Sequence, residues 1–209
     1  MTARPTSVSG LPVEEVARRV KAELRDRMRR LRKAIGDEAR AGKSAGIAAR
    51  VQALSAWRDA RTVMLFVPMR TEVDVTLLER AARETGKAVT APRMTPDGRG
   101  LEVRVWVADV PPVDSGRMGV REPPASAPPA DESSIDLVVV PALALDPSGG
   151  RLGYGAGLYD SLLPRLIRAH RVGVVFDFQL VSEVPLTAGD EPMHVVVTES
   201  RTLEVAAET

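Results

Sequence analysis

The sequence predicts an α/β layered domain with a mostly parallel sheet, and three observations carry this prediction. Short apolar runs of strand length alternate with segments of helical periodicity. Several of the runs are apolar throughout, which is typical of parallel strands buried on both faces. The chain has 209 residues, enough for one domain, and no internal repeat divides it. We therefore expect a disordered N-terminal tail (1–12), a single domain (13–200) and a C-terminal tail (201–209).

The N-terminal half is expected to open with two helices. Apolar residues recur at spacings of three and four from Val13 to Ile35, and Gly36 suits the end of that helix. A second helix is predicted from Asp37 to Trp57. The next predicted elements, in order, are a buried strand over 62–67 stopped by Pro68, a helix over 73–85 closed by Gly86, a strand over 88–91 stopped by Pro92, and a strand over 101–107 with one wet face.

The C-terminal half begins with a segment of different composition. Residues 109–134 contain six prolines and little periodicity, so we expect a surface loop that crosses the domain rather than a linker between two cores. The remaining predicted elements are a buried strand over 136–141, a helix over 158–169 that Pro164 kinks or breaks, and strands over 171–176 and 193–198.

Composition excludes several classes of protein. Lys and Arg number 29 and Asp and Glu 28, and a net charge of +1 argues against binding nucleic acid over the whole surface. The absence of cysteine removes disulfide scaffolds, thiolate zinc sites and cysteine nucleophiles, and two histidines are too few for a multi-histidine metal site. There is no apolar run of about 18 residues and no secretory signal, so we expect a cytoplasmic protein without a membrane partner.

The strongest candidate for chemistry is the segment from Arg151 to Asp160. It follows a buried strand and a turn and opens a helix. Glycine at positions 153, 155 and 157 lets backbone N–H groups approach an anion, and a helix N-terminus favours phosphate. Arg151 can supply a planar charged fork, and Asp160 can hold a divalent cation. The other interpretation, a tight strand-to-helix turn with Asp160 in the first helical turn, stays open at this point.

The first predicted helix is strongly basic, with nine Lys or Arg residues between Ala17 and Lys33. One interpretation is a solvated helix face, and a weaker one is a nucleic-acid surface. A third is an anionic small-molecule site at Lys21 and Arg25, which are four residues apart and can project from one face of a helix.

Acidic residues at two other places are candidates for ligand binding. Glu72 and Asp74 follow the first strand, where ligands of open α/β sheets bind. We favour Asp74 as a helix cap and keep Glu72 as the ligand candidate. Asp190 lies in a turn before the last strand. Gly42-Lys43-Ser44 mimics the end of a phosphate-binding P-loop, but no strand precedes it, so we interpret it as helix interior.

With these pieces in order, the chain resembles the 5-formyltetrahydrofolate cyclo-ligase (methenyltetrahydrofolate synthetase) family. The resemblance extends from about Val20 to Glu199. It rests on blocks whose order and spacing are specific: Lys21 to Arg25, Arg70 to Asp74, Asp136 to Pro141, Arg151 to Asp160, Gln179, Val184-Pro185, Gly189-Asp190 and Val197 to Glu199.

The resemblance implies a three-layer α/β/α sandwich with a mostly parallel central sheet, and a specific reaction. That reaction is the ATP- and Mg²⁺-dependent conversion of 5-formyltetrahydrofolate to 5,10-methenyltetrahydrofolate. ADP and phosphate are released, and the pathway runs through a phosphorylated N5-formyl (imino-phosphate) intermediate. Such chemistry needs positioning and charge neutralisation more than a protein nucleophile. The resemblance further implies a small-molecule folate partner, with or without a polyglutamate tail, and we expect a monomer without a nucleic-acid partner.

The resemblance also implies roles for particular residues. The expected catalytic residues are Arg151 and Tyr159, and the expected Mg²⁺ ligands are Asp160 and Asp190. The expected ATP-binding residues are Lys21, Arg25, Arg151, Leu152, Gly153, Tyr154, Gly155, Ala156, Gly157 and Tyr159. The expected folate-binding residues are Val67, Glu72, Met94 and Tyr159.

The sequence departs from the family pattern at three places. Leu158 stands where the family usually has the first of two tyrosines, Phe66 is only near the position of an aromatic before Pro68, and Gly189 replaces a frequent histidine. Other functions therefore stay open: an ATP-dependent enzyme acting on a different acyl-amine, a folate- or nucleotide-binding protein without turnover, or a protein that binds RNA through its basic helix.

Overall fold

The computed structural model describes residues 13–116, 119–187 and 189–206. The predicted N-terminal tail lies outside them, as do residues 207–209. Within the described part, a seven-stranded sheet has the order β11-β10-β9-β6-β1-β2-β3. Its strands are β1 (Thr62–Met64), β2 (Ala88–Met94), β3 (Leu101–Val105), β6 (Leu137–Pro141), β9 (His170–Val174), β10 (Val195–Val197) and β11 (Thr202–Glu204). The inner strands run parallel, and only β3 and β11, at the two edges, are antiparallel to their neighbours.

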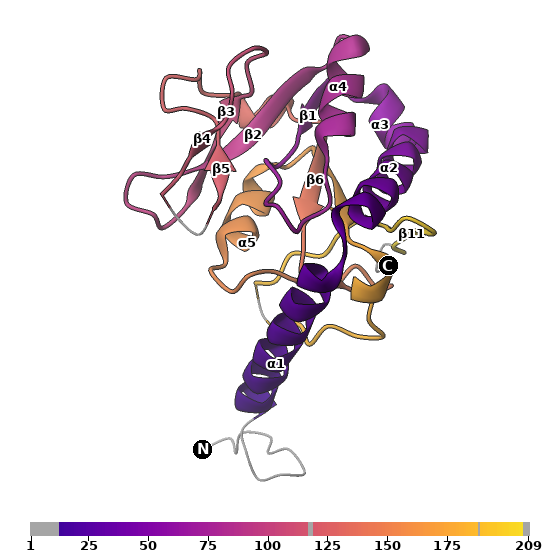
Figure 1. Ribbon diagram of the computed structural model, residues 1–209. Coiled ribbons are helices and arrows are strands. Elements are labelled where there is room, and N and C mark those ends of the chain that lie inside the picture. The colour runs from indigo at the N-terminus through magenta and orange to yellow at the C-terminus, as the bar shows by residue number, and fades with distance from the viewer. Residues whose placement is uncertain (1–12, 117–118, 188, 207–209) are drawn as a thin grey trace.

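Helices cover both faces of this sheet, as the predicted α/β/α sandwich requires (Figure 1). On one side lie α2 (Asp37–Ala53), α3 (Ser55–Asp59) and α4 (Thr76–Glu84). On the other lie α5 (Leu158–Leu162) and the 3₁₀ turn η2 (Leu163–Arg165). Because successive strand residues point to opposite faces, Val63 joins the core under α2–α4 while Met64 joins the core under α5.

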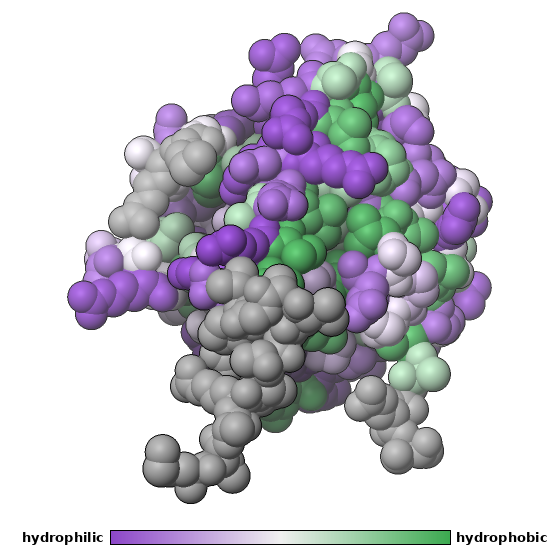
Figure 2. Space-filling model, turned by 90° about the horizontal axis from the view of Figure 1, so that it is seen from below, coloured by the Kyte–Doolittle hydropathy of each residue, from purple (hydrophilic) through white to green (hydrophobic). Residues whose placement is uncertain are grey.

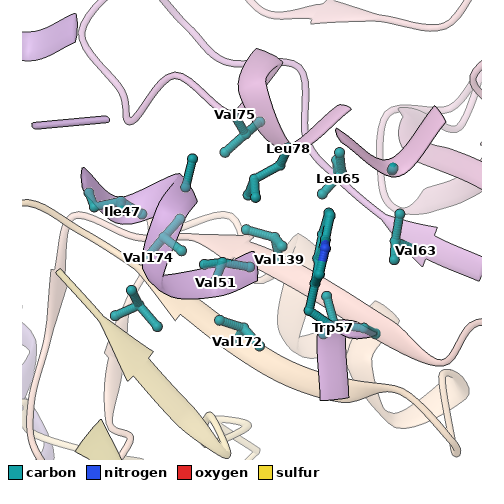
Figure 3. Packing of buried hydrophobic residues seen from close by; sticks show 14 of the residues in the cluster. Ile47, Val51, Trp57, Val63, Leu65, Val75, Leu78, Val139, Val172 and Val174 are labelled. Atoms are coloured by element: carbon teal, nitrogen blue, oxygen red, sulfur yellow. The ribbon is translucent and has the colours of Figure 1, made fainter. Parts of the chain in front are cut away.

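The core under α2–α4 is built mainly from aliphatic side chains, together with the aromatic rings of Trp57, Trp106, Phe66 and Phe176. Trp57 of α3 lies between strand residues and the inner side of the helices, as Figure 3 shows. Ile47 and Val51 project from one face of α2, and neither is accessible to solvent. Fully burying a side chain of this size stabilises the fold by roughly 1.5–3 kcal/mol. Burial of these two side chains therefore holds α2 in the core.

Helix α1 (Val13–Ala34) lies outside the sandwich and projects from it (Figure 1). Met28 packs with Leu143 and Leu152. Leu143 directly precedes β7 (Ala144–Leu145), and Leu152 belongs to β8 (Arg151–Leu152), which forms a small hairpin with β7. The hairpin follows β6, so α1 is docked on the side of the domain where β6 ends. The predicted helix over 13–35 is confirmed within one residue.

Several predicted boundaries are wrong. The second helix ends at Ala53, because Leu54 adopts extended backbone, and α3 follows separately. Strand β2 does not stop at Pro92 but continues to Met94. Proline is accommodated because β1 pairs with β2 only as far as Thr90, so Pro92 faces a partner strand on the β3 side alone.

The C-terminal part also differs from the prediction. Residues 202–204 form β11, which pairs with β10, so the domain extends beyond the expected boundary at residue 200. The predicted helix over 158–169 is two short pieces, α5 and η2, with Pro164 at the start of the second. The segment over 109–134 connects β3 to β6, as expected for a loop, but it contains the strands β4 (Val113–Asp114) and β5 (Arg121–Glu122) and the 3₁₀ turn η1 (Glu132–Ser134). Another 3₁₀ turn, η3 (Asp177–Gln179), follows β9.

The order of the strands marks one place in the sheet. The chain leaves β1 toward β2 on one side, whereas β6 leads to β9 and β10 on the other. Ligands of open α/β sheets bind where connections diverge in this way, at the carboxyl ends of the strands. Glu72 follows β1, and the glycine-rich segment follows β6, so both lie after the two strands that border this point. None of the helices among the described residues combines the length and apolar character that spanning a membrane requires.

Candidate active site

The glycine-rich segment is anchored by the turn that precedes it. The buried carboxylate of Asp146 accepts hydrogen bonds from the backbone N–H groups of Ser148 (2.9 Å), Gly150 (2.9 Å) and Val184 (2.7 Å). A Cβ at position 150 would lie 2.4 Å from an oxygen of Asp146, so glycine is required there. Asp146 therefore fixes the start of the glycine-rich segment against the segment that leads to Asp190.

The glycine-rich segment itself uses backbone conformations that favour glycine. Gly155 has φ 104° and Gly157 has φ 67°, in the left-handed region that other residues rarely adopt. Residues 155–157 are exposed. An exposed bend with glycines at alternate positions leaves its backbone N–H groups accessible to an anion.

One cation of α1 contacts this segment, and a second contacts the turn that contains Asp190. Arg25 donates from Nε to the carbonyl oxygen of Gly153 (3.0 Å), and its guanidinium lies 3.5 Å from where a Cβ of residue 155 would be. Lys21 is buried and donates from Nζ to Asp190 (2.7 Å) and to Thr187 (3.1 Å). The predicted α1 contribution to the site is therefore brought together with the glycine-rich segment and with the predicted metal ligand Asp190.

These contacts shift the ionisation of the groups involved. Burial raises the pKa of Asp190, but hydrogen bonds from Lys21 and Thr187 outweigh it and hold that pKa below its usual value. Burial and the neighbouring Arg29 lower the pKa of Arg25, and the charge of Asp190 opposes this effect. Because the guanidinium of Arg25 is partly buried, it interacts more strongly with a nearby anion than a fully solvated cation does.

Arg151 and Asp160, at the two ends of the glycine-rich segment, pair with each other. Nη2 of Arg151 donates to Asp160 over 2.6 Å, and the guanidinium carbon lies 5.6 Å from the centre of the Tyr159 ring. The side chain of Arg151 is only 4% exposed, and its Nε has no hydrogen-bond partner among the residues that the structure describes. Burial, and then the charge of Glu72, raise the pKa of Tyr159 well above its usual range, so its hydroxyl stays protonated. The two predicted catalytic residues are thus in contact.

Glu72 is buried beneath the same segment. Tyr154 donates its hydroxyl proton to one carboxylate oxygen of Glu72, and the backbone N–H of Met69 donates to the other over 2.9 Å. Arg32 of α1, whose role the sequence did not reveal, donates to the Tyr154 hydroxyl oxygen over 2.6 Å. The prediction that Asp74 caps the next helix is wrong, because Val75 is the N-cap residue of α4. Asp74 lies one residue earlier and accepts from the N–H of Thr76, the first residue of α4, over 2.9 Å.

The other predicted folate-binding residues lie near the carboxyl ends of their strands. Val67 is half-buried three residues after β1, and Met94 is half-buried as the last residue of β2. They pack against different core clusters, Val67 on the α2–α4 side and Met94 on the α5 side together with Tyr159. A separate groove of about 320 Å³ beside Trp106 and Arg83 contains none of the predicted site residues.

Apolar and charged surface adjoin on the side of the molecule from which α1 projects. Figure 2 shows green, apolar side chains in the middle of this face and purple, hydrophilic side chains around them.

Gly42, Lys43 and Ser44, the P-loop mimic, lie inside α2 as expected, where Lys43 pairs with Glu199.

Arg32 was not among the predicted site residues, although its spacing from Lys21 and Arg25 carried a signal. Lys21, Arg25, Met28 and Arg32 recur at intervals of four, three and four, and they form the inward face of α1. The apolar stripe used to predict that helix is partly exposed instead: Val20 is 42% exposed and Leu31 is 38% exposed. Arg32 lies seven residues after Arg25, on the same face of the helix.

The donors present bear on which metal ions the site can bind. No group of three or more histidine, aspartate or glutamate side chains converges within the residues that the structure describes. Asp160 and Asp190 each pair with a cation instead. Mg²⁺ usually takes one or two carboxylates together with substrate phosphates and water, so a Mg²⁺–nucleotide fits these donors, whereas a metal held by protein alone does not.

Comparison with known proteins decides the family. A model described as the 5-formyltetrahydrofolate cyclo-ligase family matches residues 17–199. The chain belongs to the 5-formyltetrahydrofolate cyclo-ligase family. The resemblance found in the sequence is thereby confirmed, and the chain is an enzyme of the cyclo-ligase class.

Individual relatives agree with this assignment. The chain is 32% identical over 192 residues to the 5-formyltetrahydrofolate cyclo-ligase of Mycolicibacterium smegmatis, with 88% of this chain and 95% of the relative covered. It is 30% identical over 148 residues to the cyclo-ligase of Escherichia coli K12, covering 69% and 81%. The NMR structure of Aquifex aeolicus 5,10-methenyltetrahydrofolate synthetase superposes with a TM-score of 0.78 at 29% identity, covering 91% of this chain and 95% of that one. The predicted sandwich fold is confirmed.

Proposed function

We propose that the enzyme converts 5-formyltetrahydrofolate to 5,10-methenyltetrahydrofolate with consumption of ATP in the presence of Mg²⁺ and release of ADP and phosphate. One observation carries the proposal: in a member of the cyclo-ligase family, Arg25 donates to the Gly153 carbonyl of a glycine-rich segment at the carboxyl edge of the sheet, and Arg151 pairs with Asp160 across the two ends of that segment. We also propose that the enzyme acts as a monomer in the cytoplasm, on folate with or without a polyglutamate tail.

In the proposed reaction, the N5-formyl oxygen attacks the γ-phosphorus of ATP and ADP leaves. The resulting imino-phosphate has an activated formyl carbon, which N10 of the folate attacks. Loss of the N10 proton and departure of phosphate from that carbon then leave the methenyl bridge between N5 and N10. Neither step needs a protein nucleophile, because phosphoryl transfer depends mainly on positioning and on neutralising the charge of the phosphates. A site without cysteine, built from glycines, cations and carboxylates, suits this chemistry.

The nucleotide is proposed to lie along the glycine-rich segment. Backbone N–H groups of Gly153, Tyr154, Gly155, Ala156 and Gly157 are the proposed phosphate ligands, and Leu152 supports them from β8. Lys21, Arg25 and Arg151 supply positive charge around the bend. Charge-assisted hydrogen bonds from such cations to phosphate are about twice as strong as neutral ones, so these side chains favour the triphosphate over a neutral ligand.

Mg²⁺ is proposed to bind with the nucleotide through Asp160 and Asp190, directly or through water. When bound, the ion supplies further neutralisation of phosphate charge. Each carboxylate is now paired with a cation that is itself a proposed phosphate ligand: Asp160 with Arg151 and Asp190 with Lys21. Both cations can turn toward phosphate when their carboxylates turn toward the ion, so neither side chain has to stay buried without a partner.

The folate ring is proposed to lie between the glycine-rich segment and the end of β1. Glu72 accepts hydrogen bonds from the N–H groups of the pterin, Val67 and Met94 provide apolar contacts, and Tyr159 lies against the substrate beside Arg151. Arg151 and Tyr159 are the proposed catalytic residues, and their contact supports the proposal because it brings a cation and a neutral phenol together at one end of the glycine-rich segment.

A turnover assay tests the proposal. The purified chain is incubated with ATP, Mg²⁺ and 5-formyltetrahydrofolate, and methenyltetrahydrofolate is followed by its absorbance, with ATP or Mg²⁺ omitted as controls. The proposal predicts product only in the complete mixture, with one ADP for each product. Because Leu158 replaces an aromatic residue of the family pattern, a different acyl-amine substrate is the alternative. ATP hydrolysis driven by another N-formyl compound but not by 5-formyltetrahydrofolate would favour it.

A further inference from the structure

A buried cluster formed by Arg32, Tyr154, Glu72 and Thr71 connects three separate parts of the chain. Arg32 comes from the last turns of α1, Tyr154 from the glycine-rich segment, and Glu72 and Thr71 from the loop after β1. The side chains of Arg32 and Glu72 are 5% and 6% exposed. Arg32 and Thr71 have no assigned part in the reaction, so the cluster needs an explanation of its own.

Arg32 is held in one orientation by contacts on several sides. Nη1 donates to the Tyr154 hydroxyl oxygen (2.6 Å), Nη2 donates to the Thr71 hydroxyl (2.9 Å), and the guanidinium carbon lies 5.5 Å from the centre of the Tyr154 ring. Its Nη1 is 3.8 Å from Glu72 Oε1. Within the described part of the chain, the buried Nε proton of Arg32 has no hydrogen-bond partner. A guanidinium that leaves one donor unpaired to keep these contacts is unusual for a group with a packing role alone.

The contacts form a relay toward Glu72. Arg32 donates to the Tyr154 oxygen, and Tyr154 donates its own proton to Glu72 Oε1, so the positive charge of Arg32 polarises the hydroxyl toward the carboxylate. The N–H of Met69 holds Oε2 over 2.9 Å. The carboxyl plane of Glu72 is thereby fixed at both oxygens, and each oxygen keeps a lone pair for another donor.

Electrostatics give the cluster a second effect. Burial raises the pKa of Glu72 above its usual value, and the Tyr154 hydroxyl, the Met69 N–H and the charge of Arg32 each oppose that rise without cancelling it. The charge of Glu72 in turn contributes to the raised pKa of Tyr159 of α5, whose hydroxyl stays neutral. Arg32 is therefore the nearby positive charge that favours the ionised carboxylate in this buried place.

We propose that Arg32, acting through Tyr154, is a positioning residue that orients Glu72 and keeps it able to accept hydrogen bonds from the folate ring. The inference rests on the proposed function, in which Glu72 binds the N–H groups of the pterin. A protonated Glu72 would have one acceptor oxygen and one hydroxyl donor. The hydroxyl donor would face the N–H donors of the pterin, and that contact is unfavourable. Because Tyr154 belongs to the glycine-rich segment, the same relay fixes the folate acceptor relative to the phosphate ligands.

The test compares four variants. Arg32→Met removes the charge, Arg32→Lys keeps it without the fork, and Tyr154→Phe keeps the ring but removes the hydroxyl. Arg30→Met removes an exposed charge two residues away on α1 and is the matched control. For each variant, KM and kcat are measured for folate and for ATP between pH 5 and 9, and circular dichroism confirms folding.

A separate readout needs no substrate. The chain is labelled with ¹³C in its glutamate carboxyl groups, and the titration of Glu72 is followed by NMR in the wild type and in each variant, with Glu72→Gln used for assignment. The readout stays informative even if the chain does not turn over 5-formyltetrahydrofolate, an outcome that would refute the proposed function but not the coupling of Arg32 to Glu72.

We expect Arg32→Met to move the titration of Glu72 upward by about one pH unit, and the acidic limb of kcat/KM for folate by the same amount. On that limb, kcat/KM at a given pH should fall by about tenfold. KM for ATP should change less than twofold. Arg32→Lys should restore part of the shift, Tyr154→Phe should show a smaller one, and Arg30→Met none. A folded Arg32→Met whose Glu72 titration is unchanged would overturn the inference. So would a wild-type Glu72 that is still protonated at pH 8, and so would an equal loss for folate and ATP without any pH shift.

Discussion

Replacing Asp146 by alanine tests how the glycine-rich segment is held. Asp146 is 2% exposed, and its carboxylate is the acceptor for the N–H groups of Ser148, Gly150 and Val184. The bonds to Gly150 and Val184 are buried, whereas Ser148 is exposed and can bind water instead. Asp146→Ala therefore leaves two buried donors without an acceptor.

The size of the effect follows from those two donors. A buried N–H group left without its partner costs about 1–3 kcal/mol, so two of them lower the free energy of unfolding by about 2–6 kcal/mol. Single domains are stable by only about 5–15 kcal/mol, so this is a large fraction of the total. The matched control is Ser148→Ala, which removes one exposed hydroxyl that bonds to Asp146 over 2.6 Å. It should cost less than about 1 kcal/mol.

Equilibrium unfolding in urea, followed by circular dichroism, measures both variants against the wild type. KM for ATP, measured under conditions where Asp146→Ala is folded, reports on the glycine-rich segment. We expect a lower urea midpoint and a higher KM for ATP in Asp146→Ala, and neither change in Ser148→Ala. Loss of less than 1 kcal/mol in Asp146→Ala, or equal losses in both variants, would refute the reasoning.

Three further changes test other parts of the account. Asp160→Asn keeps an oxygen for Arg151 but removes the charge, so ATP turnover should fall at least about tenfold with the urea midpoint little changed; a near-normal rate at saturating Mg²⁺ would rule out the metal role. Lys21→Ala should raise KM for ATP more than it lowers kcat, and an unchanged KM would remove α1 from the nucleotide site. Hydrogen bonds from two backbone N–H groups outweigh burial and lower the pKa of Asp136. Its contribution to stability is thus present above the usual aspartate pKa and lost as the pH falls below it, so Asp136→Asn should flatten the acid side of the stability–pH profile; identical acid slopes would contradict this.

The fold was predictable because the spacing of apolar residues, and the glycines and prolines between the apolar segments, indicate most of its helices and strands. The apolar runs over 62–67 and 136–141 contain β1 and β6, and the parallel arrangement follows from their burial on both faces. The strand β11 was missed because three residues, Thr202 to Glu204, at the sheet edge carry too little pattern. The passage of β2 through Pro92 depends on where β1 stops pairing, which is a tertiary property.

The site was predictable in its parts but not in its connections. Glycine spacing and the basic helix indicated an anion site, and the family resemblance supplied the roles. The pairing of Lys21 with Asp190 joins residues 169 positions apart, and no local pattern encodes such a contact. Arg32 was overlooked because the apolar stripe through Val20 and Leu31 suggested a different inward face for α1. The buried face of that helix is instead partly charged, since it meets a polar site rather than the core.

The location of the nucleotide tests the central claim most directly. With the chain labelled with ¹⁵N at glycine, Mg²⁺ and a non-hydrolysable ATP analogue are titrated in, and the amide signals are followed by NMR. The account predicts saturable shifts of Gly153, Gly155 and Gly157, weakened in Lys21→Ala, while Gly42 within α2 stays unchanged. Saturable binding that leaves the three glycines of the bend unmoved and shifts amides elsewhere would contradict it.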